Sequence, residues 1–192
     1  MANILQQIVA QTREDLIRRK RDIGFNELHS LEGYENSRAS FKAALQHEGV
    51  SVIAEVKKGS PSKGIIRPDF HPVDIALSYQ EGGATAISVL TDKPFFMGDI
   101  DFLLAISKRV NVPLLRKDFI VDPFQIKEAR AFGASAVLII VAITNGGQLN
   151  ELLAAAKEFE LDALVECYDQ ADFDRLDFNK VEILGVNNRN LR

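Results

Sequence analysis

The sequence predicts an α/β protein in which helices cover a parallel β-sheet. Between residues 51 and 186, short apolar runs alternate along the chain with helix-like segments. This alternation is typical of parallel strands joined by right-handed helical crossovers. The runs are apolar at successive positions, as expected for strands that are buried on both faces.

About fifty residues precede the first predicted strand, and we expect residues 1–50 to form a helical extension ahead of the sheet at 51–192. Residues 3–22 place apolar side chains near one stripe of an amphipathic helix, and residues 40–45 predict a second, shorter helix. The basic run at 18–21 is either a solvated helix end, whose cations suit the helix dipole, or a basic rim that attracts an anionic substrate.

Six strands and five helices are predicted after the extension. The strands cover residues 52–56, 86–90, 113–115, 136–140, 163–165 and 182–186. The helices cover residues 74–80, 99–108, 123–132, 148–159 and 170–176. In the third of these helices, Pro123 stands in the first turn and Gly133 follows the last residue, which is the usual asymmetry of helix ends.

Two architectures fit this order of elements, a doubly wound open sheet and an eight-stranded barrel. No glycine-rich dinucleotide fingerprint follows the first strand, which favours the barrel. A complete barrel takes roughly 250 residues. The predicted fold class is therefore a (β/α)8 TIM barrel with an N-terminal helical extension, of which this chain covers about six of the eight βα units.

Composition narrows the class of function. The chain is 46% hydrophobic, which suits one soluble domain with a core, and its net charge of −4 with mixed signs argues against a general nucleic-acid binder. One cysteine, Cys167, excludes an intramolecular disulfide and fits a reducing compartment. His29, His47 and His71 lack the spacing of zinc ligands. No apolar run reaches membrane-spanning length, and we expect a cytoplasmic protein.

Polar residues gather at the carboxyl ends of the predicted strands. They are Glu55, Lys57, Thr91, Asp92, Lys117, Glu166, Asn187 and Arg189. In a parallel barrel these ends share one face, where the active site lies. Each residue alone is compatible with a surface position, but two acids and two lysines that converge can hold their pKa values apart, as acid–base catalysis requires. Cys167 follows Glu166, so we expect it to point the other way and pack as a small hydrophobe.

Two further segments are candidates for substrate binding. The loop at 57–64 lacks the spacing of a nucleotide-binding P-loop, but its lysines, hydroxyls and glycines suit a phosphate or carboxylate held by a moving loop. The alternative is an ordinary mobile surface loop. The paired aromatics Phe95 and Phe96 either grip an aromatic substrate or cap the barrel core.

Four stretches closely resemble the indole-3-glycerol phosphate synthase family of tryptophan biosynthesis. They are residues 53–62, 82–92, 115–119 and 185–191. The helical extension is also typical of that family. The sequence departs from it at Ser135, where the family commonly has Asp, and at Cys167-Tyr168. The family's barrel continues for two more βα units, which supply a glutamate, a serine and much of the phosphate site, whereas this sequence ends at Arg192.

The resemblance implies a carbon–carbon lyase, specifically a decarboxylase. It closes the ring of 1-(2-carboxyphenylamino)-1-deoxyribulose 5-phosphate, with loss of carbon dioxide and water, to give indole-3-glycerol phosphate. Lys117 is then the general acid that protonates the substrate ketone, and Glu166 is the acid–base partner of a later step. Glu55 pairs with a lysine and tunes it. No metal, nicotinamide or flavin is expected, because no step is a redox step.

The same resemblance assigns residues that hold the substrate. Lys57 binds its carboxylate or phosphate, and Ser60 is a weaker candidate near the anionic groups. Phe96 and Phe119 line the anthranilate pocket. Two residues after the last strand complete the set: Asn187 orients a hydroxyl or carboxylate, and Arg189 supports charge at the rim.

Other functions remain open from the sequence. Another phosphate-binding TIM-barrel enzyme is one alternative, and a barrel fragment without catalysis is a second. We expect the native enzyme to be a monomer that binds a phosphorylated small molecule and neither nucleic acid nor membrane. We expect the 192-residue chain alone to be inactive and to self-associate, because a sheet that stops at six strands leaves two open edges.

Overall fold

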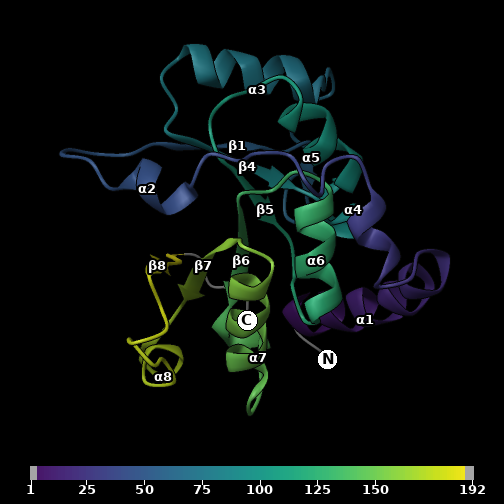
Figure 1. Cartoon of the computed structure of the whole chain (residues 1–192), viewed down its shortest axis with the longest axis vertical. Coiled ribbons are helices and arrows are strands. Elements are labelled where there is room, and N and C mark those ends of the chain that lie inside the picture. The colour runs from purple at the N-terminus through teal and green to yellow at the C-terminus, as the bar shows by residue number, and fades with distance from the viewer. Residues whose placement is uncertain (1–3, 189–192) are drawn as a thin grey trace.

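A computed structural model describes residues 4–188, and a six-stranded parallel sheet forms its centre (Figure 1). The strands, in their order across the sheet, are β1 (Ile53–Val56), β4 (Ala86–Leu90), β5 (Leu114–Lys117), β6 (Ala136–Ile140), β7 (Asp162–Cys167) and β8 (Ile183–Val186). Every neighbouring pair is parallel, and sheet order follows chain order. This curled sheet with alternating helices is part of a TIM barrel, which confirms the predicted fold class.

Helices connect successive strands of this sheet. They are α3 (Pro72–Glu81), α4 (Lys93–Phe96), α5 (Ile100–Ser107), α6 (Pro123–Ala131), α7 (Gln148–Glu158) and α8 (Gln170–Phe173). The short 3-10 helix η2 (Val141–Ile143) follows β6. At the end of α6, Gly133 adopts a φ of 86°, and a Cβ there would lie 2.4 Å from the Ser107 hydroxyl. Glycine is therefore required both by the backbone and by the close approach of α5.

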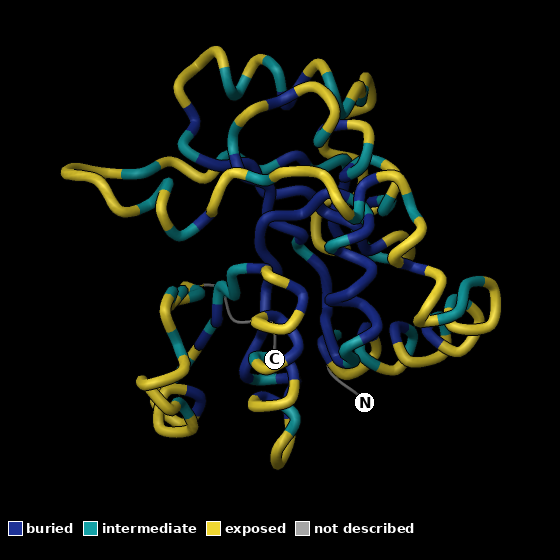
Figure 2. The backbone as a smooth tube through the Cα atoms, viewed as in Figure 1, coloured by how far each residue is buried: buried dark blue, intermediate teal, exposed yellow. Residues whose placement is uncertain are grey.

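The extension consists of α1 (Ile4–Asp22), a 3-10 helix η1 (Glu27–Ser30) and α2 (Phe41–Leu45). Leu5 and Ile8 of α1 share an apolar cluster with Ile140 and Phe124, so α1 packs beside the carboxyl ends of the central strands. Figure 2 shows the buried backbone concentrated in the strands and in the helices against them.

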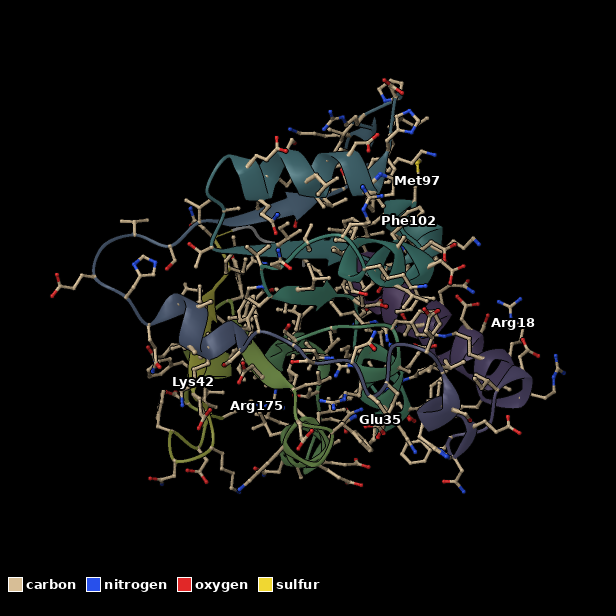
Figure 3. The ribbon with its side chains drawn as sticks, turned by 45° about the horizontal axis from the view of Figure 1, so that its top comes forward. Arg18, Glu35, Lys42, Met97, Phe102 and Arg175 are labelled. Carbon is tan, nitrogen blue, oxygen red and sulfur yellow. The ribbon has the colours of Figure 1, made fainter. Side chains whose placement is uncertain are left out.

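The basic run does stand in the last turn of α1, and Lys20 is exposed there, but two of its residues are paired with acids of the barrel. Arg19 donates two hydrogen bonds to Glu128 of α6, and Lys20 lies 2.7 Å from Asp122 at the start of that helix. Arg18 pairs with Asp15 within α1 and lies at the edge of the molecule in the view of Figure 3. These contacts fix the extension to the barrel instead of leaving a free basic rim.

Side chains alternate between the two faces of each strand, and this alternation decides which residues reach the inside. Leu115 packs in the inner cluster with Leu138, whereas Leu114 packs with Val137 against the outer helices. Lys117 follows the parity of Leu115 and points inward. Cys167 is buried with the outer cluster, on the face of β7 opposite Glu166, as predicted.

The structure differs from the predicted elements at three places. The helix α4 was not predicted, although Asp92 accepts hydrogen bonds from the amides of Phe95 and Phe96 at its start. The loop at 57–64 contains part of a small antiparallel hairpin of β2 (Gly59–Ser60) and β3 (Gly64–Ile65), because Gly64 adopts a φ of 61°. The last predicted helix, at 170–176, ends at Phe173.

Candidate active site

A cavity of about 470 Å³ lies on the inner side of the sheet, at the carboxyl ends of its strands. Its lining consists of Glu55, Lys57, Leu90, Phe96, Lys117, Asp118, Phe119, Leu138, Ile140, Glu166, Asn187 and Asn188. Seven of the nine site residues predicted from the sequence are among them. Ser60 lies in β2 and does not line this cavity, and Arg189 lies outside the described residues.

Glu55 is the centre of the charged wall. Its carboxylate accepts a hydrogen bond from Lys57 and lies 2.9 Å from the ammonium of Lys117. The side chains of Glu55 and Lys117 are 27% and 38% exposed. Burial alone would raise the pKa of Glu55, but the charge of Lys117 and hydrogen bonds from both lysines outweigh it and hold that pKa below its ordinary value. Glu55 is therefore an ionised bridge between two cations.

A second polar pair lies at β7 and β8. The side-chain amide of Asn187 donates to Glu166 at 3.0 Å, and the backbone amide of Asn187 donates to the carbonyl of Cys167 at 2.9 Å. The backbone bond extends the β7–β8 ladder by one residue and fixes the end of β8. The Glu166 carboxyl group is thereby oriented by a neutral donor, whereas Glu55 is oriented by two cations.

The remaining wall of the cavity is apolar and partly aromatic. The rings of Phe96 and Phe119 lie 5.9 Å apart at an interplanar angle of 35°. Leu90, Leu138 and Ile140 complete this wall. Phe96 comes from α4, whose amino end is held by Asp92. Such a wall suits a planar aromatic group whose charged substituents face the lysines.

Thr91 and Asp92 do not belong to this cavity, so the prediction that they share its rim was wrong. Ser88 and Leu90 take the inward positions of β4, and Thr91 therefore turns outward, where its hydroxyl donates to Asp118 at 2.6 Å. Asp92 faces the same outer side. Burial raises the pKa of Asp92 to about 6, against the hydrogen bonds from α4 that favour its ionised form.

A larger cavity, of about 870 Å³, lies at the opposite ends of β6 and β7. Two ion pairs involve acids that line it. Arg130 lies 3.2 Å from Glu160, and Lys42, labelled in Figure 3, lies 3.1 Å from Glu182 just before β8. Active sites of these barrels lie at the carboxyl ends of the strands, so the smaller cavity is the candidate active site.

Comparison with known proteins decides the family. The model of the family described as "Indole-3-glycerol phosphate synthase" matches residues 5–192 of the chain. The chain belongs to the indole-3-glycerol phosphate synthase family. The resemblance seen in the sequence is thereby confirmed, together with the lyase class and the place in tryptophan biosynthesis.

Three curated proteins named indole-3-glycerol phosphate synthase illustrate the similarity. Those of Zymomonas mobilis subsp. pomaceae and Rhizorhabdus wittichii are 46% and 47% identical over 196 residues, which cover 100% of this chain and 74% of each relative. The Salinibacter ruber protein is 49% identical over 191 residues, covering 98% of this chain and 71% of the relative. The chain thus spans about three quarters of the length of these indole-3-glycerol phosphate synthases.

The described residues, 4–188, contain neither a metal-binding cluster nor a membrane-spanning helix. No group of three or more His, Cys, Asp or Glu side chains in this range is arranged to hold a metal ion. No helix in the same range is long and apolar enough to cross a membrane.

Asp118 is the one charged residue in the lining of the candidate active site to which the sequence assigned no role. No local pattern around it predicted its partners.

Proposed function

We propose that the cavity between Glu55, Lys117 and Glu166 is where 1-(2-carboxyphenylamino)-1-deoxyribulose 5-phosphate is converted into indole-3-glycerol phosphate. Membership of the family supports the reaction, and the charged bridge of Glu55 to two lysines opposite an aromatic wall carries the assignment to this cavity. The substrate joins a planar carboxyphenyl ring to a phosphorylated sugar chain, so it needs both walls.

The first step is carbon–carbon bond formation. The ring carbon that bears the carboxylate attacks the ketone carbon of the sugar chain, and negative charge develops on the ketone oxygen. Lys117 donates a proton to that oxygen, which becomes a hydroxyl group. Glu55 accepts a hydrogen bond from the ammonium and orients it. Loss of carbon dioxide then leaves its bonding electron pair in the ring and restores aromaticity.

The second step is dehydration. The new hydroxyl group leaves as water after it receives a proton, and a proton leaves the ring system so that the indole double bond forms. Glu166 is the acid–base group for this step. Its hydrogen bond from the Asn187 amide fixes the carboxyl group without adding a charge. The two acids of the site thus have different environments, as two different proton transfers require.

Substrate binding is divided between the two walls. Lys57 holds an anionic group of the substrate, and Asn187 orients a hydroxyl or carboxylate. Phe96 and Phe119 enclose the carboxyphenyl ring. Ser60 and Arg189 remain predicted contacts to the anionic end. A cytoplasmic location and a monomeric native enzyme likewise remain our expectations.

Replacement of Lys117 tests the proposed role of the general acid. The protein used is the product of the complete open reading frame, since the relatives are longer than this chain. We expect Lys117→Ala to fold normally and to lose roughly 100- to 10,000-fold in kcat, the usual contribution of a positioned acid. Lys157→Ala, an exposed lysine of α7, is the control with unchanged turnover. Near-normal kcat in Lys117→Ala would remove the acid assignment.

A further inference from the structure

Lys117 is flanked in sequence by two charged residues, Arg116 and Asp118. Asp118 borders the cavity, but its carboxylate is bound to Thr91, Arg116 and the amide of Phe119. Arg116 follows the outward parity of Leu114 and is only 1% exposed, which makes it the largest fully buried side chain among the described residues. Asp118 is 6% exposed. An unpaired guanidinium in such a place is strongly unfavourable, so its partners are decisive for the end of β5.

The partners of Arg116 come from three different elements. Its guanidinium donates to the Thr91 hydroxyl at 3.1 Å, to the Gln125 carbonyl at 2.7 Å and to Glu128 of α6 at 2.7 Å. It also donates to Asp118 at 2.8 Å. The guanidinium is thus bound on three sides in one fixed orientation, which its planar fork favours.

The carboxylate of Asp118 is equally constrained. One oxygen accepts from Thr91 and Arg116, and the other accepts from the backbone amide of Phe119 at 2.8 Å. Burial alone would raise the pKa of Asp118, but the charge of Arg116 and the hydrogen bonds from Thr91 and Arg116 hold that pKa below its ordinary value. We call the group of Arg116, Asp118, Thr91 and Glu128 the brace.

The brace also receives the extension. Arg19 of α1 donates to Glu128 at 3.0 Å through its Nε, with a second bond from its terminal nitrogen. The backbone on both sides of Lys117 is therefore tied to β4, to α6 and, through Glu128, to α1. Lys117 itself has a flexible four-carbon stem and is partly exposed, so the position of its ammonium depends on where this backbone is held.

We propose that Arg116 and Asp118 are positioning residues for Lys117, and that the brace holds the end of β5 so that the ammonium meets both Glu55 and the substrate ketone. This inference rests on the proposed function of Lys117 as general acid. The brace touches no reacting atom. Its effect is to keep the acid within the small displacement that catalysis tolerates, since an error of about 1 Å costs roughly 100-fold in rate.

The test uses Thr91→Val, because removal of either buried charge endangers folding. Valine keeps the volume of threonine and both ion pairs, but deletes the hydroxyl that joins Arg116 to Asp118. In the product of the complete reading frame, we expect kcat to fall by roughly tenfold or more, while KM stays within about threefold. Thr91→Ser restores the hydroxyl and returns kcat to within about threefold of the wild type.

Thr12→Val is the matched control. Thr12 is buried in α1, and its hydroxyl donates to the Ile8 carbonyl within the same helix, at 2.9 Å. We expect unchanged kcat for this variant. Equal kcat in Thr91→Val and Thr12→Val would overturn the brace, whatever their stabilities.

A double-mutant cycle separates positioning from general damage. If Thr91 acts through Lys117, Thr91→Val adds no more than about twofold to the loss in Lys117→Ala. If the two losses multiply, the brace is structural only and the proposal falls. Near-normal turnover of Lys117→Ala by itself would overturn the proposed function instead, so the two failures are distinct.

Discussion

The replacement Glu55→Gln is the sharpest probe of the charged wall. The change is nearly isosteric, but it removes the only negative charge that lies between Lys57 and Lys117 among the described residues. The two ammonium groups then lose the carboxylate that bridges them. We expect weaker catalysis because the general acid is no longer drawn to one position.

The magnitude follows from the geometry of the bridge. Unit charges 2.9 Å apart attract by about 1.4 kcal/mol in water and by about 6 kcal/mol at an effective dielectric constant of about 20. Both side chains are partly exposed, at 27% and 38%, so the net attraction between Glu55 and Lys117 lies toward the lower of these two energies. Charged hydrogen bonds contribute about 1.5–3 kcal/mol net. A loss of about 2 kcal/mol from the transition state corresponds to roughly 30-fold in kcat.

The assay is steady-state turnover followed by the fluorescence of the indole product, combined with urea unfolding. Because the pKa of Glu55 lies below its ordinary 4.5 in the fold, its contribution to stability is present above that pH and is lost on acidification. The stability gap between wild type and Glu55→Gln should therefore be full at pH 7 and shrink below about pH 4.5.

Glu32→Gln is a control of similar geometry. Glu32 lies 2.8 Å from Lys108, but this pair is at the surface and contributes about 0–1 kcal/mol. We expect Glu32→Gln to leave kcat unchanged. If Glu55→Gln also kept kcat within twofold of the wild type, the bridge would contribute no more to catalysis than a surface ion pair. The role of Glu55 in positioning Lys117 would then be refuted.

Three more results are expected. Asp92→Asn removes a carboxyl group whose pKa is about 6 in the fold and 3.8 ordinarily. The unfolding free energy of the wild type should therefore fall relative to that of the variant as pH rises from about 4 to about 6, and urea unfolding that gives the same difference at every pH would contradict this. Phe96→Leu deletes the ring contact with Phe119 and should raise KM by roughly 3- to 10-fold with a smaller change in kcat, whereas an unchanged KM would place the aromatic ring of the substrate elsewhere. The 192-residue chain produced alone should sediment as oligomers with little turnover, since β1 pairs only with β4 and β8 only with β7 among the described residues; an active monomer would contradict this.

Much of the site could be predicted because polar residues two positions apart show which face of a strand points into the barrel. Glu55 and Lys57 are two residues apart, and both line the cavity. Lys117 is the last residue of β5 and Glu166 the last but one of β7, and the residues before them alternate between the two clusters. In β4 all five residues are buried, so the sequence does not distinguish its inner face from its outer face, and the outward direction of Thr91 could not be predicted.

The brace was beyond sequence reasoning for a different reason. Its contacts join residues that are far apart in the chain, such as Arg116 to Thr91 and Arg19 to Glu128, and no local pattern encodes such pairs. The short helix α4 is a different case, because Asp92 followed by Pro94 is a local signal for the start of a helix.

The contact of α1 with α6 also has a consequence for synthesis. Arg19 and Glu128 are separated by 109 residues, so α1 leaves the ribosome long before its partner exists. Until α6 has emerged, the apolar stripe of α1, including Leu5 and Leu16, has no barrel to cover. The contact of Arg19 with Glu128 therefore cannot form before α6 has been synthesised, which makes the docking of α1 a long-range step of folding.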